Sequence, residues 1–241
     1  MTREPSALNE DPVIRDLEIM SAAVNYRNWI YRQFTPILGR RVIECGAGIG
    51  NFTELLAERE LVVAVDSYGP CVSYLANRFR ANARVVPVQM DVSSPRLREL
   101  ERYQPDTIVC INVLEHVEDD RATLKNMRHL VGRGGAIALL VPAFPCLYGT
   151  IDRMLGHYRR YRREELAGKF EEAGLKVQRL FYFNAVAPFG WFVNNRVLKR
   201  TEESPVQVLV FDRWIVPWLS RIEHLCKPPY GLSLIVLAEA S

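Results

Sequence analysis

Short apolar segments that alternate with amphipathic segments constrain the fold of this 241-residue chain more than any other feature. The apolar segments are rich in β-branched residues and nearly continuous, which is typical of strands covered on both faces of a parallel sheet. We predict strands at 41–45, 61–65, 84–89, 107–111 and 136–141, and helices at 51–60, 70–80, 95–103 and 119–130. This order predicts an α/β fold with a doubly wound, mostly parallel sheet and right-handed crossovers.

The flanking segments predict additions to one domain over residues 1–241. Residues 12–38 have helical spacing and should form an N-terminal helical lid across the sheet edge. Beyond the fifth strand we predict a loop at 144–156, a helix at 163–173 that stops at Gly174, strands at 176–183 and 232–239, and an aromatic cap insertion at 184–230.

A glycine-rich segment, VIECGAGIGNF at residues 42–52, follows the first predicted strand. In an open α/β sheet this turn lies at the switch point where ligands bind. Gly46, Gly48 and Gly50 would let a ligand approach the backbone closely. The GxGxG spacing, with Glu44 before it, differs from the GxGxxG of dinucleotide sites. A tight strand-to-helix turn without a ligand is the alternative.

Acidic residues end the next two predicted strands. Asp66, followed by Ser67, could accept hydrogen bonds from both ribose hydroxyls of a nucleotide. Asp91, between Met90 and Val92, could accept one from an adenine amino group. The alternative for Asp66 is a solvated loop residue that caps a helix. The alternative for Asp91 is the N-cap of the helix at 95–103.

Five segments, ECGAGIGNF, VVAVD, QMDV, INVLEHVEDD and GRGGAIALLVP, together resemble the ordered motifs of class I S-adenosylmethionine (SAM)-dependent methyltransferases over residues 41–142. The resemblance implies a seven-stranded, Rossmann-like sheet with a reversed final hairpin, and SAM as the cofactor. It implies contacts from the three glycines and Glu44 to the methionine part, from Asp66 to ribose and from Asp91 to adenine. Asn112 and Leu114 would lie near the reacting methyl group. The AVNYRNW segment resembles one in a bacterial group of these enzymes, so Tyr26 could close over the cofactor; a core role is the alternative.

Three residues are the candidate catalytic groups: Glu115, His116 and His157. They are similar to an ExxEH motif and a later histidine that hold a divalent cation in ubiquinone-pathway O-methyltransferases and small-RNA terminal methyltransferases. Asn112 replaces the first acid, and a neutral amide is a weaker ligand for a hard cation. We therefore favour a metal-free reaction with His157 or His116 as base, and keep a divalent metal as the alternative. A purely local structural role is the other alternative for all three.

Two segments bear on the identity of the methyl acceptor, and each has several interpretations. The RRYRR run at 159–163 could be a solvated loop, a site for an anionic small-molecule or lipid-linked acceptor, or an RNA-facing patch. The aromatic residues of the cap insertion could form core, an apolar acceptor pocket or a peripheral membrane contact.

Bulk properties narrow the function classes. A net charge of +3 does not predict nucleic-acid binding. Five cysteines without a CxxC pair predict reduced thiols rather than a zinc site or disulfides. No signal peptide or membrane-spanning run is evident in the sequence, so we expect a cytoplasmic protein. We predict methyl transfer to an O or N atom of a small-molecule acceptor, which could be hydrophobic or lipid-linked. The alternatives are an RNA methyltransferase, an NAD-dependent oxidoreductase and a non-catalytic SAM-binding module.

Overall fold

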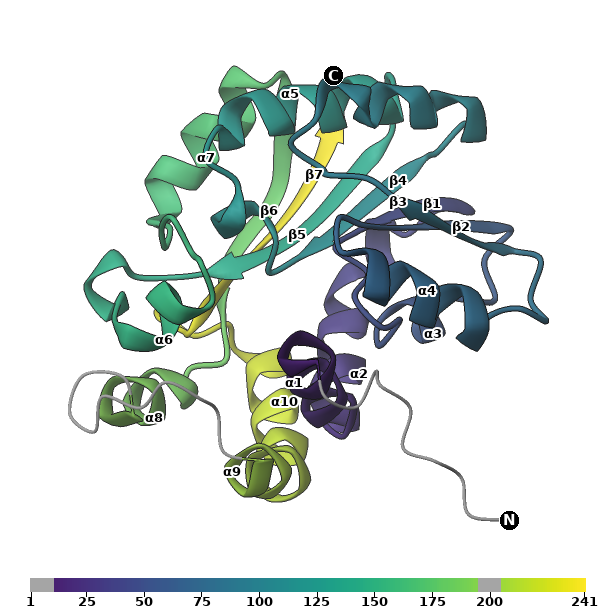
Figure 1. The fold of residues 1–241 in the computed structure, drawn as a ribbon. Coiled ribbons are helices and arrows are strands. Elements are labelled where there is room, and N and C mark those ends of the chain that lie inside the picture. Colours follow the sequence, from purple (N-terminus) through teal and green to yellow (C-terminus); the bar gives the residue numbers. More distant parts are fainter. Residues whose placement is uncertain (1–10, 195–204) are drawn as a thin grey trace, which may run out of the picture.

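The computed structural model describes residues 11–194 and 205–241, and its seven strands form one sheet. The strands are β1 (Arg41–Cys45), β2 (Leu61–Asp66), β3 (Val85–Gln89), β4 (Thr107–Ile111), β5 (Ala136–Pro142), β6 (Leu175–Phe183) and β7 (Ser233–Ala240). Their order is β3-β2-β1-β4-β5-β7-β6 (Figure 1). Strands β1 to β5 pair in parallel, and β7 is antiparallel to β5 and β6. The predicted doubly wound sheet with a reversed final strand is confirmed.

The helices flank this sheet and extend beyond one end of it. The α-helices are α1 (Pro12–Ser21), α2 (Val24–Phe34), α3 (Thr53–Leu56), α4 (Gly69–Arg78), α5 (Asp120–Val131), α6 (Thr150–Met154), α7 (Arg163–Glu172), α8 (Ala187–Phe192), α9 (Pro205–Val210) and α10 (Val216–Leu225). Short 3₁₀ turns are η2 (Thr35–Ile37), η3 (Pro95–Tyr103), η4 (Leu114–His116) and η5 (Pro145–Leu147), and η7 (Phe211–Ile215) is a π-helical turn.

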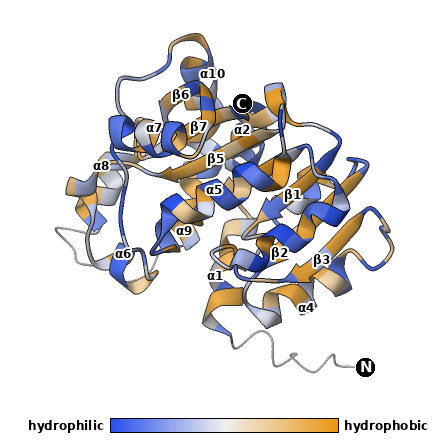
Figure 2. Cartoon of the chain, turned by 90° about the horizontal axis from the view of Figure 1, so that it is seen from above, coloured by the Kyte–Doolittle hydropathy of each residue, from blue (hydrophilic) through white to orange (hydrophobic). Residues whose placement is uncertain are grey.

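Side chains of successive strand residues pack into two hydrophobic cores, one on each face of the sheet. In β1, Ile43 belongs to the core under η3, α5 and α7, whereas Val42 belongs to the core under α2, α3, α4 and α10. Both side chains are almost fully buried. Because both faces are covered, the strands need apolar residues at successive positions, which is why they are nearly continuous in the sequence. Figure 2 shows the strands largely in the hydrophobic colour beneath helices with hydrophilic stretches.

Three predicted elements differ from the structure. Residues 95–103 form a 3₁₀ helix instead of an α-helix, and its buried Leu97 and Leu100 lie three residues apart, the period of a 3₁₀ turn. The helix expected at 51–60 is only α3, residues 53–56. The loop expected at 144–156 contains η5 and α6, because Asp152 accepts a hydrogen bond from the Gly149 N–H and so starts a helical turn.

The cap insertion packs against the lid beyond the sheet edge. Residues 195–204, within the predicted 184–230 insertion, lie outside the described residues. The side chain of Asp212 accepts hydrogen bonds from the backbone N–H groups of Asn25 (3.2 Å) and Tyr26 (2.8 Å) at the start of α2. Glu223 accepts from the N–H groups of Asn184 and Ala185, just after β6. Among residues 11–194 and 205–241 we find no helix with the length and apolar character to cross a bilayer.

Candidate functional site

The glycine loop leaves β1 at the point where the strand order reverses, between β1 and β4. Gly46, Gly48 and Gly50 all have positive φ angles, of 73°, 54° and 87°, which favour glycine. Gly46 retains accessible surface, whereas Gly48 and Gly50 are buried. A Cβ on Gly50 would lie 2.6 Å from the Phe79 ring of the α4 end. Gly50 is therefore needed for packing against this helix, which differs from its expected place under a cofactor.

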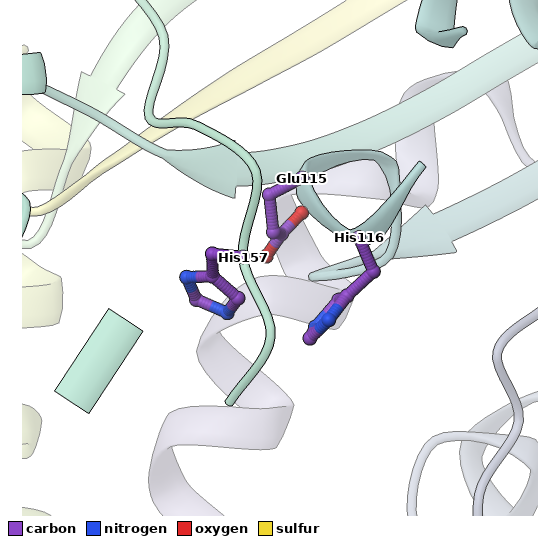
Figure 3. A group of neighbouring side chains, drawn as sticks. All are labelled: Glu115, His116 and His157. Carbon is purple, nitrogen blue, oxygen red and sulfur yellow. The ribbon is translucent and has the colours of Figure 1, made fainter. Parts of the chain in front are cut away.

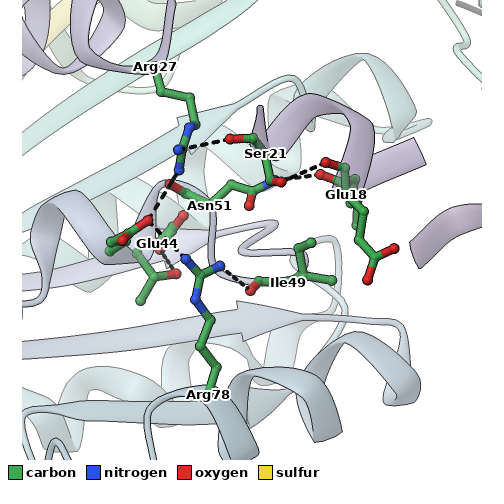
Figure 4. A network of polar contacts seen from close by, with 10 residues as sticks. Glu18, Ser21, Arg27, Glu44, Ile49, Asn51 and Arg78 are labelled. Atoms are coloured by element: carbon green, nitrogen blue, oxygen red, sulfur yellow. Dashed lines mark hydrogen bonds and ion pairs between the residues drawn. The ribbon is translucent and has the colours of Figure 1, made fainter. Parts of the chain in front are cut away.

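Two arginines hold the backbone of this loop, and the sequence did not single them out (Figure 4). Arg27 of α2 donates through NH1 to the Asn51 carbonyl (2.5 Å) and through NH2 to the Ser21 carbonyl (3.0 Å). Arg78 of α4 donates to the Ile49 carbonyl (3.1 Å). Arg27 Nε is buried and has no hydrogen-bond partner among the described residues. This donor is a candidate for a ligand bound at the loop.

Glu44 is buried beneath the loop and accepts a hydrogen bond from Thr53 Oγ1 at 2.6 Å. Burial raises the pKa of Glu44 to about 8, and the charge of nearby Asp66 adds to the effect. The carboxyl group is therefore predominantly protonated at neutral pH in this structure. Its position is close to the glycines, as expected, but it lies inside the protein.

The residues predicted to bind adenosine end β2 and β3, which are neighbours in the sheet. One oxygen of Asp66 accepts from the Gly48 N–H (2.8 Å) and the other from the Tyr68 N–H (2.9 Å). Asp91 and Ser67 are exposed, and Met90 is partly buried. Asp91 Oδ1 accepts from the Ser93 N–H at 2.8 Å.

Two predicted cofactor contacts are core residues. Val92 and Leu114 belong to the core under η3, α5 and α7, and Leu114 has no accessible surface. The expectation that Leu114 lines the cofactor is therefore corrected. Its neighbour Val113 is partly exposed, and its Cγ2 would be 2.2 Å from a Cβ on Gly46. Val113 is thus the apolar side chain against the loop, and Asn112, with φ 50°, stays exposed beside it.

The lid covers the glycine loop. The Leu17 side chain of α1 would lie 3.1 Å from a Cβ on Gly48, and Asn51 Nδ2 donates to the Leu17 carbonyl. Ile14 of the same helix is fully buried with Ile49 and Cys71. In this structure α1 therefore closes the side of the loop on which an adenosine group would lie.

Glu115, His116 and His157 lie together at the ends of β4 and β5 (Figure 3). Each offers one ligand atom, and these atoms are all within 4.8 Å of one another. The rings of His116 and His157 meet edge to face, with centroids 4.6 Å apart. His116 keeps accessible surface, but partial desolvation of its ring and the neighbouring His157 lower its pKa to about 4, which favours a neutral ring.

Glu115 is fully buried, and neither carboxyl oxygen has a hydrogen-bond partner among the described residues. Burial raises the pKa of Glu115 to about 8. A buried carboxyl group without a partner requires a proton or a cation to offset its charge. Glu115, His116 and His157 therefore fit three ligand positions of a divalent cation, and Glu115 equally fits a neutral acid.

Asp152 orients His157. The sequence did not identify it as a site residue, because it falls in the loop predicted at 144–156. Asp152 Oδ1 is 2.9 Å from His157 Nδ1 and accepts a hydrogen bond from Arg160 Nε at 2.7 Å. Hydrogen bonding to His157 and the Arg160 charge hold the pKa of Asp152 below its usual value despite its burial. An ionised Asp152 favours the His157 tautomer with the proton on Nδ1, which leaves Nε2 as a base or metal ligand.

In the RRYRR run, Arg160 and Tyr161 are buried, Arg159 is partly buried, and Arg162 and Arg163 are exposed. Arg159 pairs with Asp120 at 3.0 Å, and Arg160 is buried on Asp152. Tyr161 donates its hydroxyl to Asp120 as well. These contacts hold the first three residues of the run against the protein.

A cavity of about 1010 Å³ connects the histidines to the cap and the lid. Its floor is polar and includes Asn112, Glu115, His116, His157 and Arg160. Its walls are mainly apolar and come from the lid (Met20, Ala23, Tyr26) and the cap (Phe189, Trp191, Val193, Val206, Val210, Ile215). An acceptor with a polar reactive end and an apolar body would match this distribution.

The chain is similar to known methyltransferases over most of its length. A family model described as a methyltransferase domain matches residues 23–180. The chain is 24% identical over 164 residues to a protein of Pseudomonas aeruginosa named ubiquinone biosynthesis O-methyltransferase, covering 63% of this chain and 70% of the relative.

Solved structures share the fold. A SAM-dependent methyltransferase from Archaeoglobus fulgidus aligns with a TM-score of 0.59 and 19% identity, covering 91% of this chain and 94% of that one. The methyltransferase domain of bacterial-CtHen1-C aligns with a TM-score of 0.59 and 14% identity, covering 91% and 99%.

Proposed function

Because this chain belongs to the class I SAM-dependent methyltransferases, we propose that it transfers a methyl group to an O or N atom of a hydrophobic small-molecule or lipid-linked acceptor. One observation carries the choice of acceptor: His157, paired with Asp152, lies at the floor of a cavity whose walls are mainly apolar. The polar floor would orient the nucleophile, and the walls would bind the rest of the acceptor.

The cofactor would bind along the carboxyl ends of β1, β2 and β3. Asp66 would hold the ribose, Asp91 the adenine amino group, and the unpaired Arg27 Nε the methionine carboxylate. SAM supplies an activated methyl group on a sulfonium, so the protein needs mainly to position the acceptor and exclude water. Since α1 lies over Gly48, the lid must open before the cofactor can enter.

His157 would act as the general base. Its Nε2 would accept the proton from the acceptor O–H or N–H as that atom forms its bond to the methyl carbon. Asp152 would stabilise the resulting imidazolium, and the neighbouring Arg160 would keep Asp152 ionised. His116, with its lowered pKa, would remain neutral beside it.

A divalent cation is a second candidate, favoured by the unpaired oxygens of Glu115. Glu115, His116 and His157 would hold the ion, which would lower the pKa of a bound acceptor hydroxyl. Titration of the protein with Mg²⁺, Mn²⁺ or Zn²⁺, and turnover after chelation, separates this from the base mechanism. Full activity without metal would leave His157 as base.

The proposed function is tested by labelled methyl transfer from SAM into a lysate separated into lipid, small-molecule and RNA fractions. We expect label in the lipid or small-molecule fraction. His157→Ala should keep SAM affinity and slow turnover by about 10²–10⁴-fold. His129→Ala, on the exposed side of α5, is the matched control and should leave turnover unchanged.

Four outcomes would contradict the proposal. Wild-type turnover by His157→Ala would remove this base. Label in RNA, with binding that weakens steeply as salt rises, would favour the RNA alternative. SAM binding without turnover on any fraction would favour a non-catalytic module. NADH binding in place of SAM would indicate an oxidoreductase.

A further inference from the structure

The cap carries an apolar stripe on its outer surface. Residues from Pro205 to Leu225 are helical throughout, as α9, η7 and α10. Six apolar side chains recur along them every three or four residues and remain half or more exposed: Val206 (68%), Val210 (50%), Trp214 (68%), Trp218 (67%), Ile222 (62%) and Leu225 (87%). We call these six residues the apolar stripe. This spacing places them on one face of the helix.

The opposite face of the same helix is fastened to the protein. Asp212 and Glu223 are buried, and both carboxyl groups accept hydrogen bonds from backbone N–H groups of other segments. Val216 and Leu219 are buried in the core under α2 and α10. The apolar stripe therefore lies on the side of this helix that faces away from its buried residues.

The exposed charges beside the apolar stripe have one sign. Between 205 and 225 the charged residues are Asp212, Arg213, Arg221 and Glu223, apart from His224. Both acids are buried, and both arginines are exposed. The Arg221 guanidinium lies 5.5 Å from the centre of the Trp218 ring. Tryptophan beside arginine on an amphipathic helix suits the boundary between acyl chains and anionic headgroups.

The apolar stripe also reaches the cavity. Val206 and Val210 line the cavity and are half or more exposed on the stripe. An amphiphile could therefore pass from an apolar phase against the stripe to the floor at His157 without crossing bulk water.

We propose that the apolar stripe docks the protein on the surface of a bilayer that contains anionic lipid. Trp214 and Trp218 would insert at the headgroup boundary, and Arg213 and Arg221 would pair with lipid phosphates. A second copy of this chain is a poorer fit, because pairing two stripes would bring four arginines together without an exposed carboxylate from either helix. This inference concerns binding alone and can be tested without SAM or acceptor.

Co-sedimentation of the full chain with vesicles tests it. The wild type should bind vesicles of phosphatidylcholine with phosphatidylglycerol more strongly than vesicles of phosphatidylcholine alone. Trp214→Ser with Trp218→Ser should lower the affinity about tenfold or more for both vesicles, since it removes apolar contact area. Arg213→Gln with Arg221→Gln should lower it about tenfold for the anionic vesicles only.

A matched control removes the same charge elsewhere. Lys125 and Arg133 are exposed near the far end of the sheet, so Lys125→Gln with Arg133→Gln should leave vesicle binding close to wild type. Thermal unfolding and circular dichroism verify that each variant folds. A wild type that stays in the supernatant with both vesicles would overturn the proposal. So would a dimer that the tryptophan variant converts to a monomer, because the stripe would then be a subunit interface.

Discussion

Buried carboxyl groups near the switch point differ in the partners they have. Asp152 has a histidine, an arginine and a backbone N–H, and its pKa stays low. Glu44 has one hydroxyl, Glu115 has no hydrogen-bond donor among the described residues, and burial raises the pKa of each to about 8. Charge in this region is therefore decided residue by residue through hydrogen bonding, and not by burial alone.

Glu44 should make the cofactor-free protein less stable as pH rises. Its folded pKa of about 8 lies above the unfolded value of 4.5, so its stabilising contribution is complete below pH 4.5 and is lost by pH 8. Relative to Glu44→Gln, the wild type should lose on the order of 5 kcal/mol of unfolding free energy over this interval. Urea unfolding at several pH values measures it, and parallel curves for the two proteins would contradict it.

Removing the Asp152 charge should lower both the stability of the protein and its rate of turnover. Asp152→Asn would leave the buried Arg160 guanidinium without a counter-charge, which costs about 3–5 kcal/mol when a buried pair is broken. It would also favour the wrong His157 tautomer. We expect lower turnover with a pH profile shifted from that of wild type, measured at a temperature where the variant is folded. An unchanged profile would show that Asp152 is only structural.

Among the elements, the cap is fastened to the lid by a side chain rather than by core packing alone. The N-cap residue of α2 is Ala23, which cannot cap the helix with its own side chain. Asp212 of η7 supplies the missing acceptor from 186 residues away. The negative charge also suits the positive end of the α2 dipole.

Asp212→Ala should therefore loosen both elements together. We expect a loss of about 1–2 kcal/mol of unfolding free energy, the usual cost of removing a helix N-cap. Hydrogen exchange should quicken at the Asn25 and Tyr26 amides and across α10. Asp119→Ala, which removes the local cap of α5, is the control: it should quicken exchange in α5 but leave α2 unchanged. Slow α2 exchange in Asp212→Ala would disprove the link.

At the scale of the whole molecule, lid, cap and sheet edge enclose the site from three sides. Figure 1 shows α1, α8, α9 and the lower part of α10 gathered beyond the same end of the sheet. Because Leu17 covers Gly48 while the cavity opens toward the cap, cofactor and acceptor should enter by different routes. Lid opening would then control the cofactor, and the cap would control the acceptor.

Weakening the lid should speed cofactor exchange. Leu17→Ala removes apolar contact between α1 and the glycine loop, so opening becomes easier by about 1 kcal/mol. SAM association and dissociation should each become about fivefold faster in stopped-flow measurements, with a smaller change in affinity. Rates equal to wild type would show that α1 does not control entry.

Local pattern was sufficient to predict the sheet and the proximity of Glu115, His116 and His157. The strands were predicted to within one or two residues, because continuous apolar runs have few other folded environments. Glu115 and His116 are adjacent in the chain, and parallel strands bring their carboxyl ends to one edge, so a meeting with His157 could be expected. The 3₁₀ form of 95–103 could not be told from an α-helix, since both periods bring Leu97 and Leu100 together.

The sequence by itself determined the strands, their mainly parallel direction and hence the sheet edge at which the glycine loop and the acidic residues gather, because these follow from short-range periodicity and chain direction. Only the tertiary structure decided which buried charged side chains have partners and which groups those partners are. Asp212 with α2 and Arg159 with Asp120 join segments that lie far apart in the sequence, and Asp152 meets both His157 and Arg160 only through the fold of residues 150–160. It also decided that Leu114 is core and that the stripe from Val206 to Leu225 faces outward, since burial depends on which elements pack together.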